Sequence, residues 1–367
     1  MRIFVINPGS TSTKLALYED ETAVVSREFQ HDKAELSHFA TVMDQLDFRM
    51  AVIRQFLTEA DINTALIDGV AGRGGMLHPL EGGVYTVSDA MIADLRKARY
   101  GEHPCNLGAI LAHELAQEWQ LPAFIVDPVV TDEMIDVARI TGFPGIKRRS
   151  LFHALSQRGA ARTVAARRGV SYESANFIVC HMGGGISIGA HRHGKVVDVV
   201  NALDGEGPMS PERTGGLPAL ALLDLIERGE YTPAELKRII VREGGLFAHL
   251  GTNDLRQVIA RADNGDTQAG LLFQALAYII AKHIAALGPA FADANGTVAI
   301  TAIIVTGGLA RSRQLVDEIS KMTGYLAPSE VVIGNEEMVS LANGAARVIK
   351  GTEKARTYTP ETSSQKT

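Results

Sequence analysis

The sequence predicts an α/β protein of two related domains, each with a mixed sheet flanked by helices. Its 367 residues are enough for two domains that each bury a core. Short β-branched runs alternate with stretches of helical periodicity, which is typical of sheets covered by helices. Residues 3–18 read as strand, glycine-containing turn and strand, and residues 177–191 repeat this order. This repetition predicts two similar domains that face one another.

The expected strands are short β-branched runs bounded by glycine or proline. They lie at 3–6, 15–18, 24–29, 69–72, 123–126, 177–181, 186–191, 196–201, 303–306 and 330–333. The expected helices have apolar residues at helical spacing, at 48–59, 107–118, 152–168, 218–227, 233–243, 252–262 and 267–286. One helix is expected to begin at Pro233, because Thr232 is a favourable N-cap residue and proline suits the first helical position.

The domain boundary is expected in the basic turn KRRS at 147–150. The first domain then covers 1–148 and is completed by a C-terminal helix at 338–352. The second domain covers 149–337. Residues 353–367 form a polar tail, and its composition predicts that the end is disordered.

Composition argues against several classes of function. The formal net charge is −6 and the pI is about 6.0, so the chain lacks the basic character of nucleic-acid binders. No apolar run approaches the ~20 residues of a membrane span, and the N-terminus lacks the pattern of a signal peptide. Cys105 and Cys180 lie far apart, in no metal or redox spacing. We therefore expect a cytoplasmic protein without nucleic-acid or membrane partners.

Three glycine-containing turns follow predicted strands, where backbone N–H groups can face an anion. NPGSTSTK at 7–14 adds hydroxyls and a lysine that suit a phosphate, although an ordinary polar hairpin turn explains it equally well. HMGGGIS at 181–187 indicates close approach of a ligand, with a loose connector as the alternative. VTGGLARS at 305–312 predicts a turn that opens a helix and passes close to a nucleotide, or a βα turn without ligand.

The segment GAHRHGKV at 189–196 nearly matches the phosphate-binding loop G-x-x-x-x-G-K-[ST]. Val196 replaces the hydroxyl residue that would bind Mg²⁺ in such a loop. The context also predicts strand, turn and strand, whereas the phosphate loop joins a strand to a helix. We therefore interpret this segment as a hairpin turn.

Five isolated polar residues occupy positions at strand ends, in loops or at a helix start: Arg73, His103, Asp127, His153 and Arg213. Taken singly, each is better explained as a member of a structural ion pair, a capping residue or a solvated side chain. Only their occurrence in one ordered set of motifs favours a common site.

That set consists of NPGSTSTK, GRGG, GEHPCNLGA, VDPVVTDEM, FHALSQ, HMGGGISIGAH, NALDGEGPMSPERTGGLP, GGLFAHLGTNDLR, VTGGLARS and NEEM, in this order. With these motifs the chain resembles the acetate and butyrate kinase family over roughly residues 1 to 350. The resemblance implies two actin-like (ribonuclease H-like) domains with a cleft between them, the second of which binds the nucleotide. It also explains the internal repetition as a duplication.

The resemblance implies roles for the residues that match the family's motifs. Arg73 and Arg213 would hold the carboxylate and the transferring phosphoryl group, which His153 would hydrogen-bond. Asp127 would lie near the acyl acceptor and Mg²⁺, and His103 would be a second catalytic histidine. The metal residues implied are Asn7 and Glu336, with the neighbouring Glu337 as the alternative to Glu336. Nucleotide and phosphate contacts are implied for Ser10, Ser12, Lys14, His181, Gly183, Gly184, Gly185, Asp254, Arg256, Gly307 and Gly308.

The activity implied is reversible phosphoryl transfer from ATP, with Mg²⁺, to the carboxylate of a short-chain acid, giving ADP and an acyl phosphate. Butyrate is the acid expected from the motifs; acetate, propionate and branched acids are alternatives, because the same catalytic set serves them all. Gly74, Gly75 and Met76 follow Arg73, where small residues would leave room for the acyl chain. An actin-like ATP-binding regulator and a sugar kinase are the alternatives of other classes. The family also implies a homodimer or a larger homo-oligomer.

Overall fold

The computed structural model describes residues 1–334 and 336–361, apart from the side chain of Glu336. The chain forms two compact units. Unit 1 comprises Met1–Asp132 and Asn335–Thr367, and unit 2 comprises Glu133–Gly334.

The unit boundary differs from the expected one at 148/149, because residues 133–148 attach to the sheet of unit 2. Arg148 donates to the Asp198 carboxylate at 2.9 Å and to the Val199 carbonyl at 2.6 Å. Glu133 forms a buried ion pair with Arg158 at 2.9 Å. The basic turn at 147–150 therefore attaches to the sheet of unit 2 through Arg148. The chain passes from unit 1 to unit 2 earlier, between Asp132 and Glu133.

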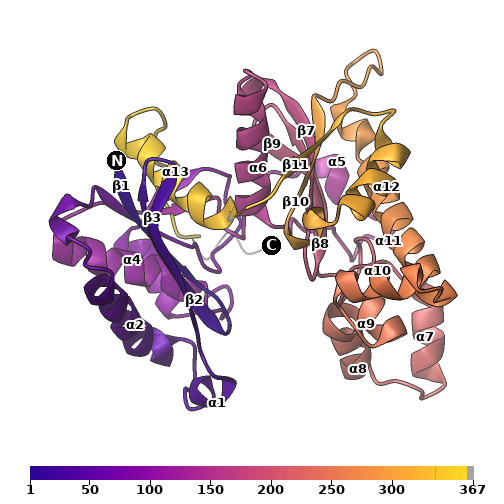
Figure 1. Cartoon of the computed structure of the whole chain (residues 1–367), viewed down its shortest axis with the longest axis horizontal. Coiled ribbons are helices and arrows are strands. Elements are labelled where there is room, and N and C mark those ends of the chain that lie inside the picture. Colours follow the sequence, from indigo (N-terminus) through magenta and orange to yellow (C-terminus); the bar gives the residue numbers. More distant parts are fainter. Residues whose placement is uncertain (335, 362–367) are drawn as a thin grey trace. The chain divides into compact units, whose positions relative to one another are not determined.

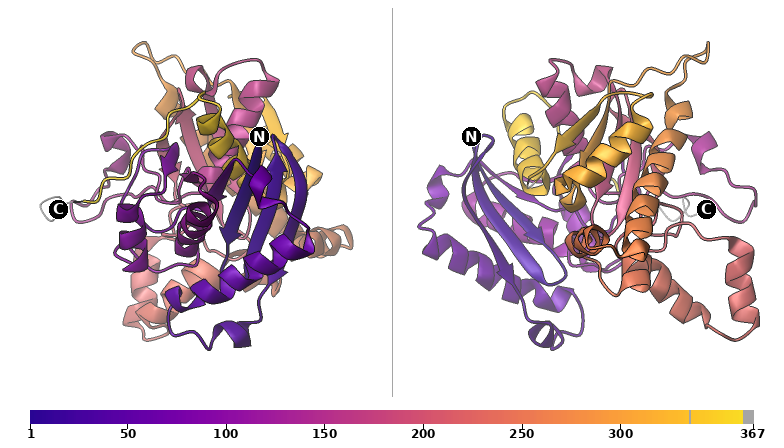
Figure 2. Two further views of the ribbon diagram at one scale, coloured as in Figure 1. Left: turned by 90° about the vertical axis from the view of Figure 1, so that its left-hand side faces the viewer. Right: turned by 45° about the vertical axis from the view of Figure 1, so that its right-hand side comes forward.

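Unit 1 is built on a six-stranded sheet in the order β3-β2-β1-β4-β6-β5. Strands β1 (Arg2–Pro8), β2 (Ser12–Glu19) and β3 (Thr22–Gln30) form an antiparallel meander, and Figure 2 shows these three indigo strands side by side. Strands β4 (Gly69–Gly72) and β6 (Ala123–Val126) continue the sheet parallel to β1. The short edge strand β5 (Val84–Thr86) pairs antiparallel with β6.

Helices cover both faces of this sheet, as Figure 1 shows. Phe4 and Ile6 of β1 belong to a buried cluster with α2 (Leu46–Glu59), α3 (Asp89–Arg96) and α4 (Asn106–Trp119). Because strand side chains alternate, Ile3 and Val5 point to the opposite face, on which α13 (Glu336–Ile349) packs. The short helix α1 (Lys33–Leu36) has no buried residues. A C-terminal helix thus completes unit 1.

Residues 353–361 of the polar tail pack on unit 1, and disorder was expected only for the end of that tail. Tyr358 is 3% exposed, and its hydroxyl donates to the Asp94 carboxylate at 2.7 Å. The N–H of Arg356 donates to the Val84 carbonyl at 2.7 Å, which extends the edge of the sheet. Residues 362–367 lie outside the described part of the chain.

Unit 2 repeats the topology of unit 1. Its sheet has the order β11-β10-β7-β8-β9, and it consists of β7 (Asn176–Met182), β8 (Ile186–Arg192), β9 (Lys195–Val200), β10 (Ala302–Thr306) and β11 (Ser329–Val332). In both units the first strand pairs antiparallel with the second and parallel with the fourth. The internal repetition in the sequence therefore corresponds to two related sheets. The tight turn at His193 and Gly194 joins β8 to β9, which confirms the hairpin interpretation of GAHRHGKV.

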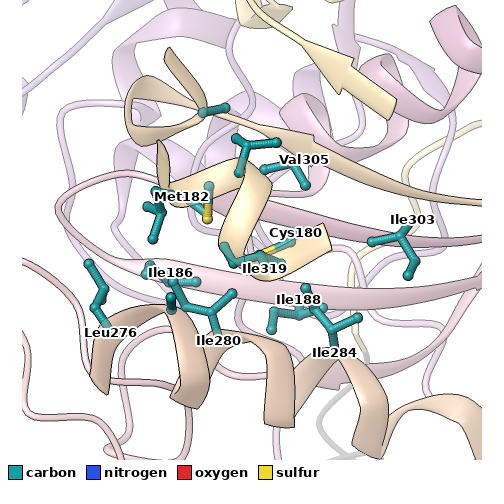
Figure 3. Packing of buried hydrophobic residues seen from close by; sticks show 14 of the residues in the cluster. Cys180, Met182, Ile186, Ile188, Leu276, Ile280, Ile284, Ile303, Val305 and Ile319 are labelled. Atoms are coloured by element: carbon teal, nitrogen blue, oxygen red, sulfur yellow. The ribbon is translucent and has the colours of Figure 1, made fainter. Parts of the chain in front are cut away.

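In unit 2, α6 (Ala154–Arg167) packs on one face of the sheet, and α11 (Thr267–Ala286) and α12 (Arg313–Thr323) pack on the other (Figure 1). Figure 3 shows Leu276, Ile280 and Ile284 of α11 directed at Ile186 and Ile188 of β8. Further helices are α5 (Asp136–Arg139), α7 (Ala219–Glu227), α8 (Pro233–Arg238), α9 (Gly245–Leu250) and α10 (Leu255–Asp263). Helix α8 begins at Pro233 with a capping box from Thr232, as predicted.

The expectation that no apolar run approaches the length of a membrane span is wrong for one segment. Thr267–Phe291 has 25 residues and a mean hydropathy of 1.6 in its most apolar window, so by length and composition alone it is long enough to cross a membrane. Its core-facing residues Leu272, Leu276, Ile280 and Ile284 recur every four positions, which is the stripe of a helix that packs on a sheet. The apolar character of α11 is thus used, at least on this face, for the core of unit 2.

Candidate active site

The NPGSTSTK segment is the end of β1, a tight turn and the start of β2. The N–H of Gly9 donates to the Ser12 carbonyl at 2.8 Å and closes the turn, while Ser10 is exposed at its tip. Asn7 lies directly opposite Lys14 in the register, so both side chains are on one face of the sheet. Lys14 lies 3.7 Å from Glu28 of β3 and is 40% exposed. The turn therefore presents hydroxyls and a cation on the surface of unit 1.

A buried arginine, which sequence reasoning missed, supports this turn from below. Arg49 of α2 is 0% exposed and donates to the Gly9 carbonyl at 2.9 Å and to the Ser12 carbonyl at 3.0 Å. It also donates to Thr13 Oγ1 and to Gln45 Oε1, both at 3.0 Å. Burial lowers the pKa of Arg49 to about 10, so it remains charged at neutral pH. By holding the turn's carbonyls on the inner side, Arg49 fixes the shape of the surface that the turn presents.

Asn7, Arg73 and Glu337 form a polar cluster at the carboxyl ends of β1 and β4. The Asn7 amide donates to Glu337 Oε2 at 2.9 Å. Arg73 Nη1 donates to Asn7 Oδ1 and to Glu337 Oε2, both at 3.3 Å. Arg73 and Glu337 are each 29% exposed, so the cluster is half-buried and accessible. Three residues from distant parts of the chain, including two predicted site residues, are thereby brought together.

The oxygen atoms of this cluster are of the kind that Mg²⁺ prefers, and Asn7 Oδ1 and Glu337 Oε2 also accept from Arg73. That ion prefers oxygen ligands and is usually held by one or two carboxylates together with the phosphates of the substrate. Glu337 supplies a carboxylate and Asn7 an amide oxygen within one cluster. The side chain of Glu336, the expected metal residue, lies outside the described residues, whereas its neighbour Glu337 does occupy the cluster. Among the described residues no group of three or more His, Cys, Asp or Glu could hold a metal ion without a substrate.

His103 lies close to this cluster, in the loop before α4. Its Nδ1 accepts from the N–H of Cys105 at 3.2 Å and lies 3.0 Å from the Cys105 thiol. Burial, and secondarily the charge of Arg73, lower the pKa of His103, so the ring is neutral at neutral pH. Burial raises the pKa of Cys105 to about 11, which keeps its thiol protonated and able to donate. With Nδ1 accepting, His103 carries its proton on Nε2.

Asp127 follows β6, and its backbone adopts a left-handed conformation with a φ of 39°. Such a conformation is uncommon outside glycine and often marks a functional position. The Asp127 N–H donates to the Gly83 carbonyl at 2.9 Å, and Asp127 Oδ1 accepts from the Gly83 N–H at 2.8 Å. The residue is 3% exposed, and its Oδ1 atom is used to hold the backbone at Gly83.

The glycines after Arg73 do not create the open space that the sequence suggested. A methyl group at Gly74 would lie 2.8 Å from Pro128 Cβ. One at Gly75 would lie 2.6 Å from Asn106, whose side chain also accepts from the N–H of Met76 at 2.8 Å. These glycines allow the loop that carries Arg73 to pack closely on its neighbours. The idea that they make room for an acyl chain is therefore not supported.

In unit 2, two predicted site histidines stack on each other. The rings of His153, the N-cap residue of α6, and His181 of β7 lie 3.9 Å apart at an interplanar angle of 14°. Ser187 Oγ lies 2.8 Å from His153 Nδ1, and Ser156 Oγ lies 2.8 Å from His181 Nδ1. Each ring is thus fixed through Nδ1, with the other edge turned away from these hydroxyls.

The second glycine turn lies next to these histidines and against Arg213. A methyl group at Gly185 would collide with the Arg213 guanidinium, so a side chain at this position would displace Arg213 from its present place. Arg213 Nη1 donates to the Ala202 carbonyl at 2.7 Å, and Nε donates to the Val241 carbonyl at 3.3 Å. Ser210 Oγ donates to the Gly184 carbonyl at 2.6 Å. Strand β7 and the loop that carries Arg213 are thereby joined around one polar surface.

A pocket of about 620 Å³ lies at the end of β10 in unit 2. It is lined by Asp254, Arg256 and Gly308, which were expected at the nucleoside, and by Leu255, Ile259 and Leu309. Asp254 caps α10 and pairs with Arg256 at 2.7 Å. Gly307 has a φ of 86° and would meet the Met182 carbonyl oxygen at 2.5 Å if it carried a methyl group. The pocket combines apolar and polar lining residues, as small-molecule sites generally do.

Comparisons with known proteins identify the relatives of this chain. A family model described as the acetokinase family matches residues 143–356. A protein of Maridesulfovibrio salexigens named probable butyrate kinase is 51% identical over 358 residues, covering 97% of this chain and 98% of its own. A protein of Oleidesulfovibrio alaskensis with the same name is 49% identical over 364 residues, with coverages of 97% and 98%.

Solved structures share the architecture. The acetate kinase of Porphyromonas gingivalis matches with a TM-score of 0.76 at 19% identity, over 94% of this chain and 99% of that one. A propionate kinase of Francisella tularensis matches with a TM-score of 0.70 at 18% identity, over 94% and 98%. At these identities the likeness shows a common fold.

Proposed function

This chain belongs to the acetokinase family and has its actin-like fold, and from this premise we propose that it phosphorylates butyrate with ATP. The observation that carries the proposal is Arg73, held at the carboxyl ends of β1 and β4 by Asn7 and Glu337. The guanidinium group of an arginine in a half-buried polar cluster can bind both oxygens of an anionic acceptor such as a carboxylate. The relatives named probable butyrate kinase, about half identical over nearly the whole chain, support butyrate as the acid.

In the proposed reaction, a carboxylate oxygen of butyrate attacks the γ-phosphorus of ATP. The bond between the γ-phosphorus and the bridging oxygen breaks, and ADP leaves with the electron pair of that bond. Because the acceptor is already an anion, no general base is required. The protein's task is positioning and charge stabilisation, as in phosphoryl transfer generally. In the reverse direction the same groups form ATP from butanoyl phosphate.

The proposal divides the tasks between the two units. In unit 1, Arg73 binds the carboxylate and offsets its repulsion from the phosphates, while the turn around Ser10 and Ser12 presents hydroxyls to a phosphate. Asn7 and Glu337 would hold Mg²⁺ that arrives with ATP, and this ion would neutralise part of the phosphate charge. His103, neutral and protonated on Nε2, is a hydrogen-bond donor for an oxygen of the substrate.

In unit 2, the proposal assigns the nucleoside to the pocket beside Asp254 and Gly308. The N–H groups of Gly184 and Gly185 would contact the phosphates, whereas the N–H of Gly183 donates to the Gly185 carbonyl at 3.0 Å and closes the turn. Arg213 and His153 would stabilise the charge that spreads over the transferring phosphoryl group, where pre-oriented donors act most strongly. Arginine suits this task because its charge persists even when burial lowers its pKa.

Trapping of acyl phosphate as hydroxamate tests the proposal. Purified protein, ATP and Mg²⁺ are incubated with linear acids from acetate to hexanoate and with isobutyrate, and butyrate is expected to give the highest kcat/KM. Arg73→Gln should abolish most of the product, whereas Arg54→Gln, in an exposed pair with Glu118, should not. A preference for another short-chain acid would correct the substrate and keep the chemistry. No hydroxamate from any acid would refute the enzyme and favour an ATP-binding regulator.

A cytoplasmic location and a homodimer or larger assembly are further parts of the proposal, taken from the sequence and its resemblance to the family. Light scattering after size-exclusion chromatography tests the assembly. A monomer at micromolar concentration would contradict it.

A further inference from the structure

Five polar side chains form a continuous hydrogen-bonded chain inside unit 2, ending at His153. Tyr172 Oη lies 2.9 Å from His191 Nδ1, and His191 Nε2 lies 3.2 Å from Gln157 Oε1. Gln157 Nε2 lies 2.8 Å from Ser187 Oγ, which lies 2.8 Å from His153 Nδ1. The three middle residues are 0% exposed, so water does not compete for these bonds.

The donor and the acceptor of each of these hydrogen bonds can be assigned, starting from the orientation of the Gln157 amide. Gln157 Nε2 lies 3.1 Å from the Ser187 carbonyl oxygen as well as near its hydroxyl. A carbonyl oxygen can only accept, so the amide nitrogen must be on this side and Oε1 must face His191. His191 Nε2 then donates to Gln157, and His191 Nδ1 accepts from the Tyr172 hydroxyl.

His191 is neutral in this arrangement. Burial lowers its pKa well below the usual range, and the charges of Arg158 and Arg162 act in the same direction. Both guanidinium groups lie over the Tyr172 ring, at 5.5 and 4.9 Å from its centroid. A neutral ring has one donor and one acceptor, as the bonds to Gln157 and Tyr172 require.

The bonds that the Ser187 hydroxyl accepts determine that it donates its own proton to His153. Its hydroxyl oxygen accepts from Gln157 Nε2 at 2.8 Å and from the backbone N–H of His153 at 3.3 Å. These two donors use both lone pairs of the oxygen, so the hydroxyl proton is donated to His153 Nδ1. An imidazole that accepts at Nδ1 and is neutral carries its proton on Nε2.

The backbone leaves space for this chain. Ser187, Gly189 and His191 lie on the same side of β8, because strand side chains alternate. A methyl group at Gly189 would lie 2.5 Å from Gln157 Oε1. The missing side chain therefore lets the Gln157 amide pass between Ser187 and His191.

We propose that Ser187, Gln157, His191 and Tyr172 are positioning residues that hold His153 in the Nε2–H tautomer, so that its outer nitrogen is always a hydrogen-bond donor. The benefit to catalysis rests on the function proposed above, in which His153 contacts the transferring phosphoryl group. A ring protonated on Nδ1 instead would present an acceptor to an anionic oxygen and repel it. These hydrogen-bonded side chains thus exclude the Nδ1–H tautomer of His153 before the substrate binds.

Nitrogen-15 NMR of the histidine rings tests the proposal directly on the whole protein. The eleven histidines are resolved in a long-range proton–nitrogen spectrum above neutral pH, and the signals of His153 are assigned with His153→Asn. We expect the shift of Nδ1 to be that of an unprotonated nitrogen and the shift of Nε2 that of a protonated one. A wild-type His153 protonated on Nδ1, or a mixture of tautomers, would overturn the proposal without any variant.

Two variants test the cause. Ser187→Ala removes the donor to Nδ1, and a mixture of tautomers at His153 is expected. Gln157→Glu keeps the shape but replaces the amide donor by an acceptor, which draws the Ser187 proton away and should favour Nδ1–H on His153. Thr163→Ala on the exposed side of α6 is the control and should keep the wild-type spectrum. A folded Ser187→Ala protein with the wild-type tautomer would contradict the role of Ser187.

Steady-state kinetics of the Ser187→Ala variant tests the catalytic role of the tautomer independently of the NMR measurement. In Ser187→Ala we expect kcat to fall about 10- to 100-fold, by analogy with the residues that hydrogen-bond and orient metal-bound histidines in other proteins. KM for ATP and for the acid should remain close to wild type, because the binding groups are untouched. An unchanged kcat with an altered tautomer would refute the catalytic part alone. If wild-type protein forms no acyl phosphate, the proposed function fails while the tautomer measurement stands.

Discussion

Arg213 shows how a single side chain is oriented for the anion that the proposed function assigns to it. Burial lowers its pKa and the neighbouring Glu212 opposes this, so its charge is kept but poorly hydrated. Two backbone carbonyls orient the guanidinium through Nη1 and Nε. Within the described residues, Nη2 has no hydrogen bond of its own, which leaves a donor for a phosphoryl oxygen. A group oriented in advance in this way does not have to reorganise during the reaction.

Replacing Arg213 by alanine should keep the fold and lower kcat by about 10²- to 10³-fold, as the loss of one pre-oriented donor does elsewhere. Steady-state kinetics with ATP and butyrate measures this, with circular dichroism to confirm folding. Arg228→Ala is the control, because this arginine is 56% exposed and pairs only with Glu230 within the described residues. Near-normal kcat in a folded Arg213→Ala protein would remove the residue from the mechanism.

Glu336 and Glu337 can be separated by their effect on Mg²⁺. Glu337→Gln removes the charge from the cluster with Asn7 and Arg73, so we expect the Mg²⁺ concentration for half-maximal activity to rise at saturating ATP. Glu336→Gln is the matched variant, one residue away. If Glu336→Gln shifts the Mg²⁺ titration and Glu337→Gln does not, the assignment is reversed in favour of the residue first expected.

Arg49 should matter for stability as well as for the shape of the turn at Gly9–Ser12. In Arg49→Met the carbonyls of Gly9 and Ser12 lose a charged donor in a buried place, and we expect the free energy of unfolding to fall by about 2–4 kcal/mol. Urea denaturation measures this change, and the KM for ATP should rise as the turn loosens. Arg54→Met, on the exposed side of the same helix, is the control. Equal stabilities of the two variants would contradict the role of Arg49.

Among the elements, α11 illustrates how a cap responds to pH. The Asp266 carboxylate accepts from the N–H groups of Ala269 and Gln268 and pairs with Arg261. The bond from Ala269 is the largest of the causes that lower the pKa of Asp266 from its ordinary 3.8, followed by the bond from Arg261. A carboxyl group with a depressed pKa in the folded state stabilises the protein above its unfolded pKa, and this stabilisation is lost as the pH falls through the folded pKa.

We therefore expect the wild-type free energy of unfolding to fall more steeply below about pH 4 than that of Asp266→Asn. Asparagine keeps the capping oxygen but cannot titrate, so it removes this contribution selectively. Denaturant unfolding at a series of pH values from 6 to 3 measures both curves. Parallel curves would show that Asp266 does not contribute to acid unfolding.

Regular elements were predicted where the local pattern and the packing agree. Strands β4 and β6 and helix α11 have the predicted bounds, because each is a clear run between glycine or proline or a continuous apolar stripe. The sequence did not predict β5, since three residues at a sheet edge carry too little periodicity. The helix expected at 233–243 ends at Arg238 and continues as a π-helical turn, a change that depends on tertiary packing.

The candidate site was predictable only in part, for a related reason. Motifs located Arg73, His153 and Arg213, but the residues that hold them lie far away in the sequence, such as Glu337 beside Arg73. Arg49 was missed because a lone arginine in a helix is usually solvated. Its spacing to Ile53 and Phe56 places it on the buried stripe of α2, and this signal was available.

At the scale of the whole molecule, the chain passes through unit 1 twice. Unit 2 is one continuous segment with its own core, whereas unit 1 needs both Met1–Asp132 and the segment that carries α13. We expect a fragment of residues 133–334 to fold alone and to unfold cooperatively. The fragment 1–132 should be poorly folded, because Ile3 and Val5 lose the helix that covers their face.

Circular dichroism during urea titration of both fragments tests this expectation. Adding residues 335–367 as a peptide should restore structure to the fragment 1–132. Cooperative unfolding of 1–132 by itself, or a disordered 133–334, would contradict the division of the chain.

The same path of the chain has a consequence for synthesis on the ribosome. The strands of unit 1 emerge first, yet their second apolar face stays uncovered until all of unit 2 has been translated and α13 follows. Unit 2 is translated after the strands of unit 1, but it can complete its core before unit 1 does, because it is one continuous segment. A growing chain therefore carries an unfinished sheet for most of its translation, and during this interval it is exposed to aggregation and is a natural client for chaperones.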